Sequence, residues 1–542
     1  MRKDIQSSLV TLIEDSLKKM DLDSGGLLSL ELVQDSRFGD LTTNIALRIS
    51  KRTGRSPLEI SKAVIETIKK EMAGSPLKGY ITDVKAEGAG FINFYLSNGY
   101  FHELLKDVIE KGRDFIKSGT GKGKRVLIEF VSANPTGPLS VAHARQAAAG
   151  DALANILINL GFDVKKEYYL NDEGNQINIL GRSIELRLKE LSGEKVEFPE
   201  DHYQGEYIYD IAKAAKSGKV KNFSEFGVEY ILGIIKKELE DFGVRFDNWF
   251  SQKSLRESGK IEKALGFLKE KGFLYEQEGA LWFKSTEFGD DKDRVVIKSD
   301  GSYTYLAPDI AYHQDKFKRG FDLLINFWGP DHHGYINRLK AAVAAFGKSA
   351  DSLSIIIVQL ASIFRAGKPV QMSTRRGQYI TLREILDEVG ADASRFFFLM
   401  RRTSSHLDFD LDVAKKQTSE NPVYYVQYAH ARICSILNNS SVKFDPKGLD
   451  LSLLKEREEI ELIKKICQFS YIMNICLTTL DPYMLTVYLQ ALAESFHKFY
   501  DKHRVLGQQD DLTMARLALI EGARLALSCG LELLGVSRPE KM

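Results

Sequence analysis

The residues with the clearest chemical potential follow an apolar strand near residue 130. The run RVLIEFV, residues 125–131, is typical of a buried strand in a parallel sheet that is covered on both faces. Asn134 and the turn residues 135–138 end this strand, and Ser140 is well placed as the N-cap of a helix whose first amides, residues 141–143, stay unpaired. A helix N-terminus at the carboxyl end of a parallel strand binds anions. The sequence therefore predicts a phosphate site here, with His143 as a donor.

A second group of polar residues lies near the end of the predicted sheet. Tyr305 and Asp309 are four residues apart, and Asp309 directly follows Pro308, which indicates a helix start. Two interpretations fit Asp309: a carboxylate that faces a cleft, or a plain helix cap. The pattern alone does not separate them.

The segment GPDHH follows another apolar strand, LLINFW. Gly329 allows a nucleotide to approach the backbone at the strand end. Asp331, His332 and His333 could suggest a metal cluster, but adjacent side chains diverge at a turn, so one ion rarely takes all three. Contact between Asp331 and a ribose is the favoured interpretation.

Two segments supply cations that could neutralise phosphates. The linker SGTGKGKR carries Lys122 and Lys124, but it precedes a strand and does not have the spacing of a phosphate-binding loop. It is read as a basic linker or as a source of cations near the phosphate site. The segment FRAGKPVQMSTRRGQYITLREIL carries Lys368, Arg375 and Arg376, and in isolation it would also fit a solvated charged loop.

Composition sets limits on partners and compartment. The chain has 542 residues, 75 of them basic and 74 acidic, so its net charge of +1 neither supports nor excludes a nucleic-acid partner. The first twenty residues fit an amphipathic helix instead of a secretory leader, and the longest apolar stretch is too short for a bilayer, which favours a cytosolic protein. The four cysteines lie in helical patterns without a CxxC pair, so we expect free thiols and no zinc.

The length and the order of patterns predict a multidomain α/β protein. We expect an α+β appendage over residues 1–115 and a doubly wound parallel sheet over 120–400, with an insertion at about 190–295. An all-α domain should follow over 415–542. Its helix SENPVYYVQYAHARICSIL begins with Asn421 as cap and Pro422 at the first position.

Aromatic side chains share a face of that helix, since Tyr424 and Tyr428 are four residues apart. Core packing is one interpretation. The other is that these rings and Arg432 stack on unpaired bases of an RNA.

The stretch EFVSANPTGPLSVAHARQAAAGD resembles the first signature of class I aminoacyl-tRNA synthetases, in the form used by arginyl-tRNA synthetases. Two positions depart from it: Ser140 stands where the first histidine is usual, and Ala142 stands where glycine is usual. The segment QMSTR resembles the second signature, and it lacks both lysines because Gln371 and Thr374 replace them. In this family a lysine before the first signature is thought to compensate, which makes Lys122 and Lys124 candidates. The resemblance covers almost the whole chain.

The resemblance implies roles for individual residues. The arginine pocket would be Glu129, Asn134, Tyr305 and Asp309. The ATP phosphates would meet Ser140, His143, Lys122, Lys124, Ser373, Arg375 and Arg376, and the nucleoside would meet Gly329, Asp331 and Met372. The tRNA would meet Phe91 and Asn93 in the appendage and Tyr424, Tyr428 and Arg432 in the helical domain. The pocket agrees with chemistry, because carboxylates bind the planar fork of a guanidinium bidentately.

The resulting hypothesis is a cytosolic, monomeric enzyme that joins L-arginine to its tRNA through an arginyl-adenylate. It would use ATP with Mg²⁺ held mainly by phosphates and water, without metal ligands from the protein and without a membrane. Two rivals remain. A tRNA-binding paralogue without catalysis would fit the altered signature residues, and a class I synthetase for another amino acid would not need two acids in its pocket.

Overall fold

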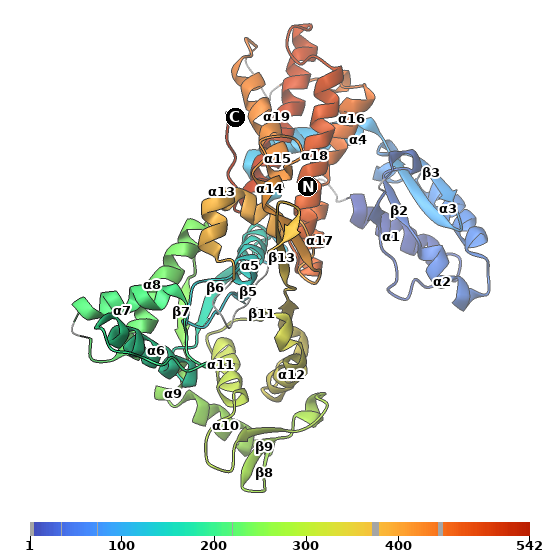
Figure 1. Ribbon diagram of the computed structural model, residues 1–542. Helices are drawn as coiled ribbons and strands as arrows, with labels where there is room; N and C mark the ends of the chain where they lie inside the picture. The colour runs from blue at the N-terminus through green and yellow to red at the C-terminus, as the bar shows by residue number, and fades with distance from the viewer. Residues whose placement is uncertain (1–4, 34, 73, 219, 371–378, 443–447) are drawn as a thin grey trace. The chain divides into compact units, whose positions relative to one another are not determined.

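The computed structural model divides the chain into two compact units (Figure 1). Unit 1 holds residues 1–112, 440–467 and 498–523, and unit 2 holds the rest. The residues that the structure describes are 5–33, 35–72, 74–218, 220–370, 379–442 and 448–542. The helical region after residue 415 is therefore shared between both units.

Unit 1 contains an antiparallel sheet of order β1-β2-β4-β3. Its strands are β1 (Glu31–Leu32), β2 (Leu41–Thr43), β3 (Ile81–Glu87) and β4 (Phe91–Leu96). Its helices are α1 (Ile5–Lys18), α2 (Ile45–Thr53), α3 (Pro57–Met72), α4 (Asn98–Lys111) and α16 (Arg457–Cys467). Ile92, Phe94 and Leu96 of β4 are buried, and α2 and α3 pack on the sheet. Phe91, Asn93 and Tyr95 alternate with these residues along β4 and therefore lie on the opposite face of the sheet.

Unit 2 contains a five-stranded parallel sheet of order β12-β11-β5-β6-β7. Its strands are β5 (Arg125–Glu129), β6 (Asp163–Leu170), β7 (Asn248–Ser251), β11 (Leu323–Trp328) and β12 (Leu353–Ile357). From β5 the chain adds β6 and β7 on one side, and then crosses to add β11 and β12 on the other. The order therefore reverses between β5 and β11, which is where doubly wound sheets bind ligands. The predicted fold class is confirmed.

Helices cover both faces of this sheet, as its apolar strands predicted. Helix α5 (Val141–Asn159) packs on one face. On the other, Leu127 of β5 joins a cluster with residues of α11 (Leu306–Lys318) and α12 (Ile336–Ala345). Because alternate residues of a strand share a face, Glu129 points to the same side as Leu127, toward α11.

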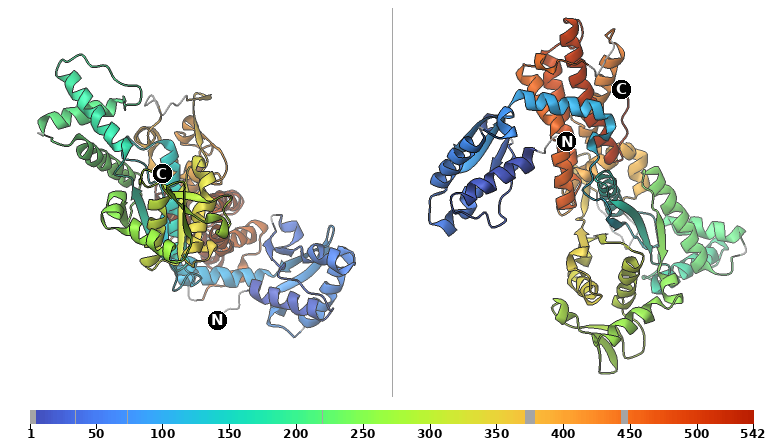
Figure 2. Two further views of the ribbon diagram at one scale, coloured as in Figure 1. Left: turned by 90° about the horizontal axis from the view of Figure 1, so that it is seen from below. Right: turned by 180° about the vertical axis from the view of Figure 1, so that it is seen from behind.

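The predicted insertion at about 190–295 differs from the structure in one respect. The edge strand β7 lies inside that range, so the sheet divides the insertion into two parts. The first part holds α7 (Glu206–Ser217) and α8 (Phe223–Asp241), which pack with the preceding α6 (Asn175–Leu191) in a helical layer beyond the β7 edge (Figures 1 and 2).

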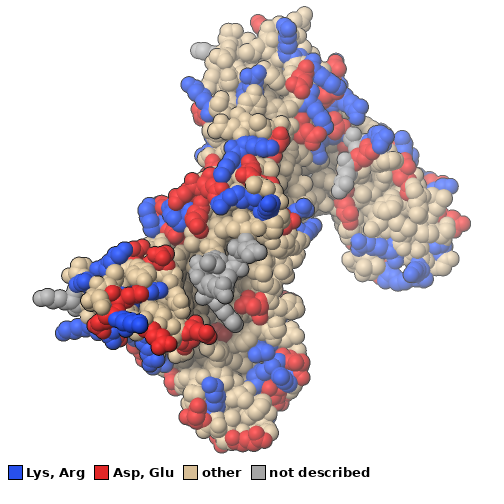
Figure 3. All heavy atoms as spheres, viewed as in Figure 1, with Lys and Arg blue, Asp and Glu red and all other residues tan. Residues whose placement is uncertain are grey.

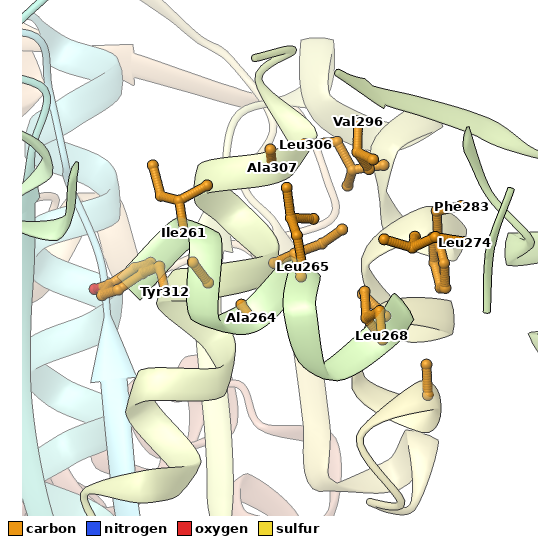
Figure 4. Packing of buried hydrophobic residues seen from close by; sticks show 14 of the residues in the cluster. Ile261, Ala264, Leu265, Leu268, Leu274, Phe283, Val296, Leu306, Ala307 and Tyr312 are labelled. Atoms are coloured by element: carbon orange, nitrogen blue, oxygen red, sulfur yellow. The ribbon is translucent and has the colours of Figure 1, made fainter. Parts of the chain in front are cut away.

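The second part of the insertion packs against α11. It consists of α9 (Gln252–Glu257), α10 (Lys260–Glu270), β8 (Leu274–Gln277), β9 (Ala280–Phe283) and β10 (Arg294–Ile297). Ile261, Leu265 and Leu268 lie on one face of α10, where helical spacing brings them together. Tyr312 of α11 closes this cluster at the end nearest the sheet (Figure 4).

A smaller sheet and the last helices complete the described fold. The sheet has the order β14-β13-β15, with β13 (Ala361–Arg365), β14 (Lys368–Pro369) and β15 (Leu407–Asp410). The helices are α13 (Leu382–Leu399), which bends at Gly390, α14 (Leu411–Ala414), α15 (Pro422–Asn438), α17 (Phe469–Thr479), α18 (Tyr483–Lys502) and α19 (Asp510–Leu533). Short 3₁₀ helices are η1 (Ser36–Phe38), η2 (Pro76–Gly79), η3 (Gly112–Ile116), η4 (Ser285–Phe288), η5 (Pro330–Tyr335), η6 (Ala350–Ser352) and η7 (Leu451–Leu453). None of the helices in the described ranges is long and apolar enough to cross a membrane.

The segment after α19 serves as a strip of hydrogen-bond acceptors. Carbonyls between residues 533 and 539 accept from Asn155 of α5, Arg395 of α13, and Gln427 and His430 of α15. A Cβ on Gly535 would lie 2.3 Å from the Arg395 guanidinium, and the residue's φ is +67°. Glycine is therefore required at this position for both space and conformation.

Candidate active site

The turn after β5 is strained and held by β6. Val131 and Ser132 have φ of 68° and 38°, although neither is glycine. Left-handed backbone at such residues persists where the surroundings enforce it, commonly at functional sites. Here the Ser132 hydroxyl donates to Glu129 Oε1 at 3.2 Å and accepts the Tyr169 amide at 3.0 Å. The turn thereby orients one oxygen of the Glu129 carboxylate.

His143 lies in the first turn of α5 and faces back to the cap. Its Nδ1 accepts the Ser140 amide at 3.1 Å and lies 3.2 Å from the Ser140 hydroxyl. Burial lowers the pKa of His143 to about 4. The ring is therefore neutral near pH 7 with its proton on Nε2, which leaves Nε2 as a donor.

The two signature segments are joined by backbone hydrogen bonds. The Leu382 amide donates to the Leu139 carbonyl at 2.7 Å, and the Val141 amide donates to the Ile380 carbonyl at 3.3 Å. The sequence analysis was wrong to leave the Val141 amide unpaired, because it could not see this distant partner. Gln371, Met372, Ser373, Thr374, Arg375 and Arg376 lie outside the described residues, and their roles stay predictions.

Two tyrosines from distant elements hold the turn before α5. The Tyr207 hydroxyl of α7 donates to the Thr136 carbonyl at 2.7 Å, and the Tyr379 hydroxyl donates to the Pro138 carbonyl at 3.1 Å. A Cβ on Gly137 would lie 3.2 Å and 3.3 Å from these two hydroxyl oxygens. Glycine is favoured there because the hydroxyls converge on the backbone.

A third clamp comes from within α5. The Arg145 side chain is buried, and its guanidinium donates to the carbonyls of Gln359, Leu360, Arg402 and Ser405. Burial lowers the pKa of Arg145 to about 10. The helix that carries His143 is thus fixed to the segments that flank the small sheet.

Two carboxylates lie near enough at the switch point for the charge of one to act on the other. Asp309 lies in the first turn of α11, as predicted, and Glu129 ends β5 with 7% of its surface exposed. Burial raises the pKa of Asp309 to about 7; the Tyr335 hydroxyl counteracts this in part, and the negative charge of Glu129 adds to the rise. The pKa of Tyr169 is also raised, first by burial and then by Asp309 and Glu129. The polar region between Glu129 of β5 and Asp309 of α11, called the hollow below, therefore favours a cation.

A chain of buried polar groups runs behind these acids. Lys316, with 0% exposed surface, donates to Glu129 Oε2 and to Asn326 Oδ1 at 3.2 Å. The Asn326 amide lies 2.9 Å from His313 Nε2, and His313 Nδ1 lies 2.8 Å from the Asp309 carbonyl oxygen. Burial and the charge of Lys316 keep the pKa of His313 well below its usual value, so the ring is neutral.

The other two residues predicted to bind arginine, Asn134 and Tyr305, are exposed to solvent. Asn134 is exposed and its amide donates to Gln176 Oε1 at 2.7 Å. Tyr305 precedes α11 and is 85% exposed, so it does not pack in the hollow in this structure. The structure thus brings Glu129 and Asp309 together and leaves Tyr305 in solvent.

The residues predicted for the nucleoside follow β11. Gly329 begins η5 with an ordinary φ of −70°, and a Cβ there would lie 2.6 Å from Asp331 Oδ1. Asp331 is exposed and pairs with His332 at 3.4 Å. Both therefore lie at the carboxyl end of a strand next to β5. No group of three or more possible metal-ligating His, Cys, Asp or Glu occurs among the described residues.

Lys122 and Lys124 do not lie with the other phosphate candidates. They precede β5, whose amino end is about 16 Å from its carboxyl end for five residues of strand. Their loop packs at the turn between α5 and β6, where the Gly121 amide donates to the Leu160 carbonyl. The structure therefore places these lysines at the opposite edge of the sheet from the signature, and their role at the phosphates stays a prediction.

The two residues of unit 1 that were predicted to contact tRNA differ in their exposure to solvent. Phe91 is 39% exposed, whereas Asn93 is only 5% exposed and its Oδ1 accepts the Thr42 hydroxyl at 2.5 Å. Asn93 lies in the middle of β4 between β2 and β3, so its neighbours cover it. Asn93 is therefore buried in this structure, and its contact with tRNA stays a prediction.

On α15 the predicted shared face is confirmed. The helix begins at Pro422 with Asn421 as its cap, and the Tyr424 and Tyr428 rings stack with centroids 6.2 Å apart. The His497 ring lies 5.9 Å from that of Tyr428. Arg432, one turn further along, is exposed.

Several residues of the site were not found from the sequence: His313, Lys316, Asn326, Tyr169, Tyr335, Tyr207 and Arg145. A signal for two of them exists, because Asp309, His313 and Lys316 follow the spacing of one helix face. The hydrogen bonds of Tyr207 and Tyr379 give no such signal in the sequence, because their acceptors are backbone carbonyls.

Three family models match the chain. They are "tRNA synthetases class I (R), catalytic domain" over residues 105–402, "Arginyl tRNA synthetase N terminal domain" over 7–96, and "DALR anticodon binding domain" over 426–542. Arginine–tRNA ligase of Geobacter sp. (strain M21) is 46% identical over 562 residues and 100% of both chains. That of Staphylococcus aureus (strain USA300) is 45% identical over 557 residues and 99% of both.

Solved structures give the same result. A putative arginyl-tRNA synthetase from Campylobacter jejuni is 38% identical with a TM-score of 0.76, covering 82% of this chain and 100% of that one. Arginyl-tRNA synthetase from Thermus thermophilus has a TM-score of 0.78 at 21% identity, covering 99% and 100%, and so shares the fold.

Proposed function

Since the chain belongs to the arginine–tRNA ligase family, it is an ATP-dependent enzyme that joins arginine to tRNA, and we propose how its residues do so. The observation that carries the proposal is the pair of acids at the switch point, Glu129 and Asp309, beside the helix that bears His143. The arginine carboxylate attacks the α-phosphorus of ATP, pyrophosphate leaves, and the tRNA hydroxyl then takes the arginine from the adenylate.

Arginine binds in the hollow between β5 and α11. The guanidinium lies between Glu129 and Asp309, where burial strengthens the charge-assisted hydrogen bonds. Asn134 holds the amino-acid head group at the rim, and Tyr305 covers the side chain once arginine is present. A lysine side chain would satisfy two carboxylates less well, because its ammonium is a single point of charge.

ATP phosphates lie at the N-terminus of α5. The neutral His143 donates through Nε2, because Ser140 occupies its Nδ1. The Ser140 amide thus orients His143, and the Ser140 hydroxyl turns from Nδ1 to donate to a phosphate oxygen when ATP binds. Ser373, Arg375 and Arg376 neutralise the departing pyrophosphate, and Gly329, Asp331 and Met372 contact the nucleoside.

ATP would carry Mg²⁺ bound by its phosphates and by water, which would neutralise phosphate charge. We infer no zinc, a monomer, and a cytosolic location. The domains over 1–115, 120–400 and 415–542 would bind the tRNA elbow, catalyse the reaction and read the anticodon, respectively. As in other class I enzymes, the 2′-hydroxyl would attack first.

For tRNA, Phe91 offers an exposed ring on the sheet of unit 1, and Tyr424, Tyr428 and Arg432 offer planes for base stacking. Acidic and basic residues intermingle over the face shown in Figure 3, so this view does not identify an RNA path by charge. The paralogue without catalysis has no support in the first signature, where His143 keeps its donor.

The test is aminoacylation with each of the twenty amino acids, alongside ATP–pyrophosphate exchange with and without tRNA. We expect charging with arginine alone. Charging with a different amino acid, or tRNA binding without either reaction, would overturn the proposal.

A further inference from the structure

Lys316 is buried without being part of the proposed contacts to arginine or ATP. A lysine is rarely fully buried unless it is paired. Its ammonium donates to Glu129 and Asn326, and lies 4.1 Å from the centre of the Tyr312 ring. The three neighbours come from β5, β11 and α11, which are the elements that meet at the switch point.

The contacts of Glu129 leave little freedom to its carboxylate. Oε2 accepts from Lys316 and Oε1 accepts from the Ser132 hydroxyl. A carboxylate has about four lone-pair sites, so each oxygen retains capacity for a guanidinium. Lys316 and Ser132 therefore fix the direction in which that capacity points.

The charges around the hollow can be counted. Lys316 neutralises Glu129, and the charge of Asp309 remains beside it. Arginine adds one net positive charge, because its ammonium and carboxylate groups cancel. With Lys316 in place, the pocket and its substrate match in charge; without it, the buried acids would be in excess.

We propose that Lys316 is a positioning residue for arginine: it holds the Glu129 carboxylate toward the pocket and balances its charge, so that the guanidinium meets the charge of Asp309. This rests on the proposed roles of Glu129 and Asp309. The chain through Asn326 and His313 to the Asp309 carbonyl ties the position of Lys316 to the first turn of α11.

A purely structural ion pair would behave differently. Removing one partner of a buried pair destabilises a protein strongly, because it leaves an unpaired charge. That effect would lower stability and active fraction, but would not separate arginine from ATP. The test must therefore compare the KM values of the two substrates.

The variants are Lys316→Met, Glu129→Gln and the double variant, each measured by ATP–pyrophosphate exchange with tRNA present and by thermal unfolding. We expect Lys316→Met to raise the arginine KM at least about tenfold with the ATP KM within about twofold, and the double variant to recover Tm but not arginine affinity. Equal changes for both substrates, or recovery of arginine affinity in the double variant, would overturn the proposal.

Arg319→Met is the matched control. Arg319 lies just beyond α11 and pairs through both Nη atoms with the fully buried Glu167. The variant also strips a buried acid of its cation, so Tm should fall comparably. Its arginine KM should stay within about twofold of the parent; a rise like that of Lys316→Met would make the effect general instead of specific.

Two further outcomes separate the levels of the argument. If Glu129→Gln leaves the arginine KM unchanged, the proposed pocket fails; if Glu129→Gln raises it and Lys316→Met does not, only the role of Lys316 fails. Should Lys316→Met not fold, Asn326→Ala removes an acceptor of Lys316 without leaving an unpaired charge. We expect about a threefold rise in arginine KM, and an unchanged value would overturn the proposal.

Discussion

In the hollow between β5 and α11, polar side chains pair with one another away from water, whereas the sheet of unit 1 presents Phe91 to solvent. Glu129 pairs with Lys316, and its negative charge adds to the rise that burial causes in the pKa of Asp309. The Phe91 side chain, by contrast, presents an apolar ring to solvent. Since electrostatic interactions strengthen as water is excluded, a single change in the hollow should act strongly and on one substrate, and a single change on the sheet should act weakly.

Asp309→Asn should give the largest effect. Removing one charged partner of the guanidinium should lower kcat/KM for arginine by an amount that corresponds to about 2–4 kcal/mol of lost transition-state stabilisation. The parameters for ATP should change little. Steady-state exchange kinetics with each substrate varied would show this. If the arginine parameters do not move, Asp309 does not belong to the pocket.

His143→Ala should follow in size. Losing one hydrogen-bond donor to the phosphate in the transition state should raise the activation free energy by about 2–3 kcal/mol and so lower kcat. The exposed His406, which bonds Ser362 on the small sheet, supplies the control His406→Ala, whose kcat should match the parent. A fully active His143→Ala enzyme would refute the phosphate role.

The pH dependence of arginine use tests the electrostatics of the hollow directly. Asp309 has a raised pKa of about 7, so it is protonated below that pH and binds a guanidinium poorly. The charged or titratable neighbours of Asp309 are Glu129, Lys316 and Tyr335. As Asp309 loses its proton, kcat/KM for arginine should rise roughly tenfold from pH 6 to pH 8.

The same shift has a consequence for stability. Because the folded pKa lies above the ordinary value of 3.8, the free enzyme loses stability from this group as pH rises through about 7. Bound arginine should therefore raise Tm more at pH 8 than at pH 6. Asp309→Asn should remove that difference, and equal Tm shifts in the parent at both pH values would contradict the assignment.

Phe91→Ala and Asn93→Ala should separate contact from structure. The first should raise the KM for tRNA a few-fold with no change in Tm, because the ring is exposed. The second should lower the free energy of unfolding by about 1 kcal/mol, since it removes the bond from Thr42. Tm and charging assays measure both; a tRNA effect confined to Asn93→Ala would reverse our interpretation.

Lys122→Ala and Lys124→Ala should have the smallest effect. Both lysines lie at the amino end of β5, so kcat in pyrophosphate exchange should stay within about twofold of the parent. A large loss in either variant would show that the phosphate site extends farther than the strand end.

Local patterns predicted what depends on local interactions. The strand at 125–129, the cap at Asn421 and the position of Asp309 follow from residue type and short spacing. The strained backbone at Val131 and the edge strand β7 depend on partners that are distant in sequence. The same is true of the Glu129–Lys316 pair, which joins residues 187 positions apart. Burial of Asn93 likewise depends on two neighbouring strands.

The acceptor strip at residues 533–539 has a practical consequence for protein engineering. Helices α5, α13 and α15 each donate a side-chain hydrogen bond to its backbone. Ending the chain before residue 537 would remove the acceptors of Gln427 and His430, and ending it before residue 533 would also leave the buried Arg395 guanidinium without its Leu534 acceptor and would loosen the helix that carries His143. An affinity tag is therefore better attached beyond the exposed Met542 than in place of these last residues.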